Sequence, residues 1–219
     1  MNISSIKRTV KELILKLTAK EKSKYIEYIR SCYDNSKETP TILCSTCIGG
    51  MIYHNLGLKF MTPTINLWCD AEDLSKIAEN PQKYLSAPIE FTDNTEFDYP
   101  VGKIIDVPIY FTHYKTREEA VEKWYERAKR FDENNVYIIT DDNGLSHEGK
   151  QRLINSRHKR LIIFTDKDRE DEYSFKLANG FKKPYSVRDV YGFAPFEREF
   201  NYANWLSDKN DYKVVRKQW

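Results

Sequence analysis

From residue 41 onward, short apolar runs alternate with segments in which apolar residues recur at helical spacing. Runs of β-branched and aromatic residues that end in turn residues indicate strands, and the amphipathic segments between them indicate crossover helices. The sequence therefore predicts an α/β fold with a Rossmann-like, largely parallel sheet flanked by helices. The expected strands cover residues 41–44, 64–69, 104–112, 136–140 and 161–165.

Local signals mark several ends of the expected helices. Gly57 is typical of a left-handed helix stop, and Thr116 with Glu119 forms a capping box that opens a helix. The span 81–102 is irregular and acidic, and it is expected to form a hairpin or a long loop. The expected helices cover residues 50–56, 70–78, a segment that begins after 116, and 147–155.

Residues 1–38 are predicted to form a separate helical extension. Apolar residues at positions 6, 10, 13, 14 and 17 share one helical stripe, and Thr18 with Glu21 forms a capping box that opens a second helix. We therefore expect a helical hairpin. Residues 33–40 are polar and end in a proline, so they are expected to lead into an α/β domain at residues 39–219.

The formal net charge of +2 hides an uneven distribution, because residues 1–30 carry +5 and the remainder carries −3. A basic amphipathic terminus favours peripheral contact of residues 1–38 with an acidic membrane surface or a membrane-bound enzyme, although most such faces are simply solvated. The negative balance of the remainder, together with the lack of a recognised binding motif, argues against nucleic acid as a partner.

The sequence favours a cytoplasmic location, with contact to the inner face of the membrane as the alternative that the basic terminus suggests. No run of about 18 apolar residues occurs, and the first residues lack the hydrophobic region of a signal peptide. The four cysteines are then expected to be thiols in a reducing compartment rather than a disulfide framework. They are Cys32, Cys44, Cys47 and Cys69.

Polar residues follow each of the five expected strands. In an open parallel sheet, ligands bind outside the carboxyl ends of the strands, where strand-to-helix loops and helix N-termini collect. This rule brings polar groups from five loops to one edge. The residues that it selects are Ser45, Thr46, Cys47, Gly49, Gly50, Asp70, His113, Tyr114, Thr116, Asp141, Asp142, Asn143, Asp166 and Asp168.

The segment after the first strand carries the most chemistry. Gly49 and Gly50 let a ligand approach the backbone, and free helix N–H groups favour an anion such as a phosphate or carboxylate. The same position is expected to lower the pKa of Cys47, which makes Cys47 a candidate nucleophile with His113 as its base. The alternatives are a buried structural cysteine and a hydrogen-bonded structural histidine.

Two other patterns indicate different chemistry. Cys44 and Cys47 form a CxxC, but Pro63 follows Cys47 by only 16 residues, too few for the helix and strand of a thioredoxin-like fold. Asp166 and Asp168 match the DxD pattern that holds a divalent metal in some glycosyltransferases, but the pattern is common by chance and a solvated charged turn is the favoured interpretation. We predict no metal site.

Several separate motifs occur in a fixed order along the chain. They are Cys47-Ile48-Gly49-Gly50-Met51-Ile52-Tyr53, Leu56-Gly57-Leu58, Thr62-Pro63-Thr64-Ile65-Asn66-Leu67, Tyr99-Pro100-Val101-Gly102, and His113-Tyr114 followed by Glu119-Ala120, Lys123-Trp124, Arg127 and Arg130. Together they closely resemble the bacterial family DUF1919, whose function is unknown, over about residues 40–206. Members of that family are commonly encoded among genes for exopolysaccharide, capsule or lipopolysaccharide synthesis. The resemblance therefore implies a role in making or modifying surface polysaccharide.

The expected function is glycosyl transfer from an activated sugar, with a sugar nucleotide or a glycan acceptor as the partner and no cofactor identified. The catalytic candidates are His113 and Cys47. The expected ligand-binding residues are Ser45, Thr46, Gly49, Gly50, Tyr114, Trp124, Arg127 and Asp141. Two alternatives stay open: cysteine-dependent acyl transfer or hydrolysis through Cys47, and a non-catalytic carbohydrate-binding or assembly protein.

Overall fold

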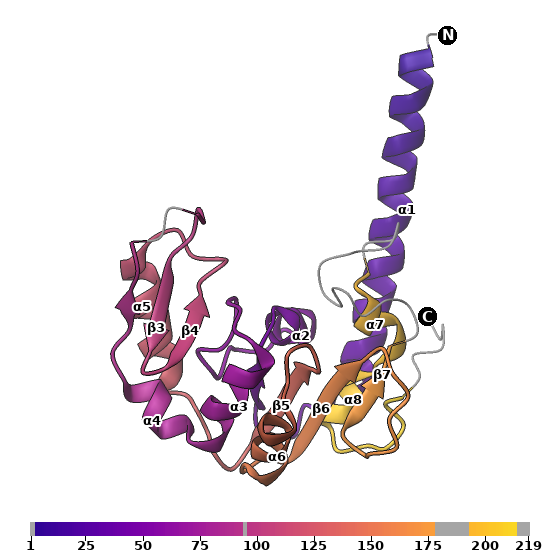
Figure 1. Cartoon of the computed structure of the whole chain (residues 1–219). Coiled ribbons are helices and arrows are strands. Elements are labelled where there is room, and N and C mark those ends of the chain that lie inside the picture. The colour runs from indigo at the N-terminus through magenta and orange to yellow at the C-terminus, as the bar shows by residue number, and fades with distance from the viewer. Residues whose placement is uncertain (1–2, 94–95, 178–192, 214–219) are drawn as a thin grey trace. The chain divides into compact units, whose positions relative to one another are not determined.

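The computed structural model describes residues 3–93, 96–177 and 193–213, with side chains from Thr18 onward. The chain divides into two compact units. One unit comprises Met1–Ser36 together with Leu177–Trp219, and the other comprises Lys37–Lys176. Figure 1 shows the helices and strands of both units and labels most of them.

A four-stranded parallel sheet in the order β1-β5-β6-β7 forms the centre of the larger unit. Its strands are β1 Thr41–Cys44, β5 Val136–Asp141, β6 Arg160–Thr165 and β7 Ser174–Lys176. Thr41 lies opposite Val136, and Tyr137 lies opposite Arg160. All of β1 and nearly all of β5 and β6 are buried, which explains their continuous apolar runs. The predicted α/β fold with a largely parallel sheet is confirmed.

Helices cover both faces of this sheet. Those next to the sheet are α2 Ile48–Leu56, α3 Ala71–Glu79 and α6 His147–Asn155, whereas α4 Pro81–Ser86 and α5 Arg117–Ala128 pack against each other. Helix α2 packs on one face of β1, where a side chain on Gly49 would meet Ile42 and Cys44. It ends at Gly57, whose φ of 70° is the predicted left-handed stop. Helices α3 and α6 lie on the opposite face, which carries Leu43.

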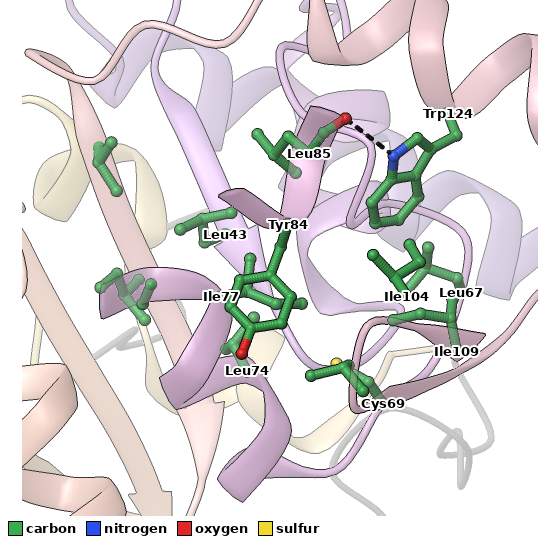
Figure 2. Packing of buried hydrophobic residues seen from close by; sticks show 14 of the residues in the cluster. Leu43, Leu67, Cys69, Leu74, Ile77, Tyr84, Leu85, Ile104, Ile109 and Trp124 are labelled. Carbon is green, nitrogen blue, oxygen red and sulfur yellow. Dashed lines mark hydrogen bonds between the residues drawn. The ribbon is translucent and has the colours of Figure 1, made fainter. Parts of the chain in front are cut away.

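One buried apolar cluster joins the parallel sheet to the rest of this unit (Figure 2). Leu43 and Ile138 contribute to it from the sheet, and Trp124 contributes from α5. The Trp124 indole N–H donates to the carbonyl of Leu85 at 3.3 Å, so its polar atom is satisfied within the core.

The expected strand at residues 104–112 is instead the second half of a hairpin. Strands β2 Glu90–Phe91, β3 Val101–Ile104 and β4 Val107–Tyr110 form a separate antiparallel sheet. The chain reverses at Ile105, which has a φ of 60°. The prediction was wrong because an isoleucine rarely adopts this left-handed conformation, so the apolar run carried no turn signal.

The expected strand at residues 64–69 is also absent. This segment follows an irregular path, with Asn66 at a φ of 62°, and it pairs with β4 only through a bridge between Trp68 and Tyr110. The prediction was wrong because the run of β-branched and apolar residues reflects burial in a loop: Thr64, Ile65 and Leu67 are each fully buried.

The smaller unit contains α1 Ile3–Cys32, α7 Pro195–Glu199 and α8 Tyr202–Leu206. The expected helical hairpin was wrong, because α1 is one continuous helix of 30 residues. Positions 17, 21, 25 and 29 keep helical spacing through the supposed break, and neither Gly nor Pro interrupts them. In the described part of the chain, no helix is long and apolar enough to cross a membrane.

Candidate functional site

Two reactive side chains meet beyond the carboxyl end of β1. Cys47 immediately precedes α2, His113 follows β4, and the Cys47 Sγ atom lies 3.2 Å from His113 Nε2. His113 is exposed and Cys47 is partly buried, so the pair can be reached from solvent. The structure therefore brings the two predicted catalytic side chains into hydrogen-bonding contact.

His113 reaches Cys47 by way of an intervening loop rather than from a neighbouring parallel strand. Trp68 and Tyr110 exchange backbone hydrogen bonds of 2.9 Å in both directions, which holds the end of β4 against the loop. The next residue in that loop, Cys69, donates its N–H to the carbonyl of Ser45 at 3.1 Å. Residues 68 and 69 thus connect the end of β4 to the end of β1.

The surroundings of Cys47 disfavour its thiolate. Burial raises the pKa of Cys47 to about 11, nearby Cys44 adds to the rise, and the Thr112 hydroxyl opposes it. The expectation that the helix start lowers this pKa was wrong, because the loss of hydration on burial is the largest effect on this thiol. A neutral thiol needs a base in contact with it when it reacts, and His113 Nε2 is in that position.

The two glycines of α2 provide room for another part of the chain. A Cβ at Gly49 would lie 2.8 Å from Ile65 Cδ1, and a Cβ at Gly50 would lie 2.6 Å from Asn66 Oδ1. The glycines therefore allow the 62–66 loop to pack closely on the first turn of α2. This packing accounts for both glycines without a ligand.

Ser45 and Thr46 are buried and hydrogen-bonded within the protein. The Ser45 hydroxyl pairs with that of Thr140 at 2.9 Å, which ties the end of β1 to β5. Thr46 Oγ1 accepts a hydrogen bond from the Ile48 N–H at 3.4 Å and lies 3.6 Å from the Cys44 thiol. Both hydroxyls thus stabilise the turn that presents Cys47.

Three other predicted ligand-binding side chains also make internal contacts. Trp124 lies in the core, and Arg127 and Tyr114 are buried. Arg127 donates to the Tyr114 hydroxyl at 2.6 Å and to the Ile65 carbonyl at 3.1 Å. These contacts anchor the 62–66 loop, so Arg127 does not present a free charge to a phosphate.

Asp141 lies at the carboxyl end of β5 and retains a place at the predicted edge. Burial raises the pKa of Asp141 to about 6 against a hydrogen bond from the Asn143 N–H, and the nearby carboxylates of Asp142 and Asp70 add to the rise. Such a carboxyl exchanges its proton close to neutral pH, which suits acid–base chemistry.

The DxD residues show no metal-binding geometry. Asp168 accepts a hydrogen bond from Lys176 at 2.7 Å, and both Asp166 and Asp168 are exposed. Across the described residues, no three His, Cys, Asp or Glu side chains are grouped so as to hold a metal ion.

An aromatic surface that sequence analysis did not identify adjoins the His113 loop. The rings of Trp68 and Tyr110 lie 4.4 Å apart, Phe97 and Tyr99 stack at 5.0 Å, and Phe97 meets Tyr110 edge-on at 5.8 Å. All four residues keep part of their surface exposed. The only sequence signal was the high aromatic content of 14%, which does not locate the surface.

Comparison with known proteins identifies one family. The model described as "Domain of unknown function (DUF1919)" matches residues 17–207. An uncharacterized protein of Haemophilus influenzae is 32% identical over 173 residues, which cover 76% of this chain and 84% of the relative. The chain therefore belongs to the DUF1919 family.

Proposed function

We propose that this protein is a thiol-dependent acyl-transfer enzyme, a transferase or hydrolase in which Cys47 is the nucleophile and His113 is the base. The observation that carries the proposal is the 3.2 Å contact between Cys47 Sγ and His113 Nε2. A sulfur nucleophile in contact with an imidazole base is the minimum arrangement for covalent acyl catalysis.

The reaction proceeds in two balanced steps. Cys47 Sγ attacks the substrate carbonyl carbon while His113 Nε2 takes the thiol proton, and the carbonyl electron pair moves to the oxygen. Collapse of this tetrahedral species breaks the bond to the leaving group and produces a thioester on Cys47. The leaving group receives the proton from His113. Water or an acceptor hydroxyl then attacks the thioester and gives its proton to His113. The bond to sulfur breaks, and His113 returns the proton to the Cys47 sulfur.

The high pKa of Cys47 makes His113 essential to this chemistry. A rise of the pKa from about 9 to about 11 lowers the free thiolate fraction at neutral pH by roughly 100-fold. Attack by a pre-formed thiolate is therefore disfavoured. Proton removal during attack avoids this loss, and only a base already in contact can provide it.

Glycosyl transfer from a sugar nucleotide is the competing proposal from the sequence. It needs groups that bind a diphosphate, yet Arg127 has two hydrogen bonds within the protein, and Gly49 and Gly50 are packed against the 62–66 loop. A role in surface polysaccharide synthesis is compatible with both reactions, with a glycan as acyl acceptor in the first. As part of a role in surface polysaccharide synthesis, we also propose peripheral membrane contact through residues 1–38.

The test is acylation of the protein by p-nitrophenyl acetate and p-nitrophenyl butyrate, followed by intact mass and peptide mapping. We expect one acyl group on Cys47, none there in Cys47→Ala, and about 100-fold slower acylation in His113→Asn. Cys32→Ala is the matched control, because Cys32 is the other partly accessible cysteine among the described residues.

Two results would count against the proposal. If Cys47→Ala cleaves the p-nitrophenyl esters as fast as the wild-type protein does, Cys47 is not the nucleophile. Hydrolysis of a sugar nucleotide that survives Cys47→Ala would favour glycosyl transfer instead.

A further inference from the structure

A single buried guanidinium is bonded both to the residue next to His113 and to the 62–66 loop, which packs on the helix that follows Cys47. Arg127 is only 8% exposed, and its Nη1 atom donates both to the Ile65 carbonyl at 3.1 Å and to the Tyr114 hydroxyl at 2.6 Å. Its guanidinium also lies 4.9 Å from the centre of the Phe60 ring. Arg127 is thus fixed on several sides and in turn fixes its partners.

One of these contacts determines where His113 lies. Tyr114 is the next residue along the chain, and its hydroxyl donates to the same Ile65 carbonyl at 3.2 Å. Its N–H donates to the Phe111 carbonyl at 2.9 Å. With both ends of Tyr114 held, the backbone of His113 is held next to it.

The other contact determines where Cys47 lies. Ile65 and Asn66 pack against the positions where Gly49 and Gly50 lack side chains. These glycines form the first turn of α2, which starts directly after Cys47. A movement of Ile65 would therefore shift the first turn of the helix and, with it, the thiol.

We propose that Arg127 is a positioning residue for the Cys47–His113 pair, acting through the Ile65 carbonyl and the Tyr114 hydroxyl. The inference rests on the proposed function for its catalytic meaning, but alkylation of Cys47 measures the pair without any acyl substrate. Cys47 Sγ and His113 Nε2 lie 3.2 Å apart, so a small movement of either side chain breaks the contact. A displacement of about 1 Å costs on the order of 100-fold in rate.

The experiment measures the rate of Cys47 alkylation by iodoacetamide between pH 6 and pH 10, resolved by peptide mass spectrometry. It compares the full-length protein with Arg127→Met, His113→Asn and the double variant. At pH 7.5 we expect each single variant to lose about 100-fold relative to wild type. The double variant is expected to lose no more than either single variant, because both changes remove the same contact.

Arg130→Met is the matched control. Arg130 lies just beyond the end of α5, three residues after Arg127. It donates to the Phe60 carbonyl at 2.9 Å, so its loss also removes an arginine anchor from the segment that leads into the 62–66 loop. The described contacts of Arg130 involve neither Ile65 nor Tyr114. We expect this variant to keep the wild-type alkylation profile. Tyr114→Phe provides a milder change for the case in which Arg127→Met does not fold, and it is expected to slow alkylation in the same pH range.

The outcomes separate the two proposals. If His113→Asn slows alkylation and neither Arg127→Met nor Tyr114→Phe does, Arg127 is not a positioning residue, while the catalytic pair stands. Additive losses in the double variant, or an equal loss in Arg130→Met, would also overturn the inference, because they indicate general destabilisation. If His113→Asn has no effect, the base role of His113 fails and the proposed function fails with it.

Discussion

Substituting Gly49 by alanine tests whether the glycine pair accommodates packing or a ligand. A Cβ at this position would lie 2.8 Å from Ile65 Cδ1, 3.0 Å from Cys44 Cβ and 3.5 Å from Ile42 Cγ2. All three neighbours belong to fully buried residues. The new methyl group therefore cannot be accommodated without moving the 62–66 loop or the helix.

The expected loss follows from two opposing effects. Overpacking a well-filled core costs about 1–3 kcal/mol, whereas replacing glycine by alanine inside a helix stabilises by about 1 kcal/mol. We expect Gly49→Ala to lower the free energy of unfolding by about 0–2 kcal/mol. At Gly50 the nearest atom is Asn66 Oδ1 at 2.6 Å, the end of a partly exposed side chain that can turn away. Gly50→Ala is therefore the control, with a change within about 1 kcal/mol of zero.

Urea unfolding followed by far-UV circular dichroism measures these differences. Ile65→Val removes the closest obstacle, so the double variant Gly49→Ala/Ile65→Val should be more stable than the two single changes predict, with a coupling of about 1 kcal/mol. A Gly49→Ala protein that is about 1 kcal/mol more stable than wild type, which is the full gain in helix propensity, would refute the packing argument. Combined with loss of ligand binding, that result would restore the hypothesis that the glycines approach a ligand.

Two further predictions concern buried carboxyl groups. Asp141→Asn should stabilise the protein by about 1–3 kcal/mol at pH 7.5, because a raised pKa means that the folded state favours the protonated acid. This advantage should vanish as the pH falls from about 6 to about 4, and urea unfolding at a series of pH values that shows no such trend would contradict it. Lys22→Met should destabilise the smaller unit by about 3 kcal/mol, because Lys22 Nζ lies 2.5 Å from the carboxylate of fully buried Glu197. Lys24→Met removes an exposed pair with Glu21 and should change the free energy of unfolding, measured by thermal unfolding, by under about 1 kcal/mol. Equal losses of stability in Lys22→Met and Lys24→Met would rule out a special role for the buried pair.

The sequence predicted the parallel strands best where burial is complete on both faces. The apolar runs at residues 41–44, 136–140 and 161–165 correspond to β1, β5 and β6, because such strands need no polar alternation. The capping signal at Thr116 also predicted the start of α5, where the Thr116 hydroxyl accepts the Glu119 N–H at 3.1 Å. Both kinds of signal depend on residues close together in the chain.

Two errors in the predicted strands occurred where the backbone turns into the left-handed region. Ile105 and Asn66 have left-handed φ values of 60° and 62°. Ile105 gives no turn signal, so the turn and the second strand of the hairpin were predicted as one strand at residues 104–112. Arg127 was predicted to bind a ligand, because the sequence does not show that this side chain bonds to the Ile65 carbonyl and the Tyr114 hydroxyl.

The approach of His113 to Cys47 does not follow from the rule about parallel strands that led to its prediction. That rule places Cys47 correctly, since β1 is parallel to its neighbour, but His113 follows an antiparallel strand of another sheet. Its position depends instead on the link through Trp68 and Cys69 and on the Arg127 contacts. Each of these is a hydrogen bond between residues distant in sequence. The geometry of the pair is therefore a property of the loop at residues 62–69, and a change in that loop should alter Cys47 chemistry even where neither partner is touched.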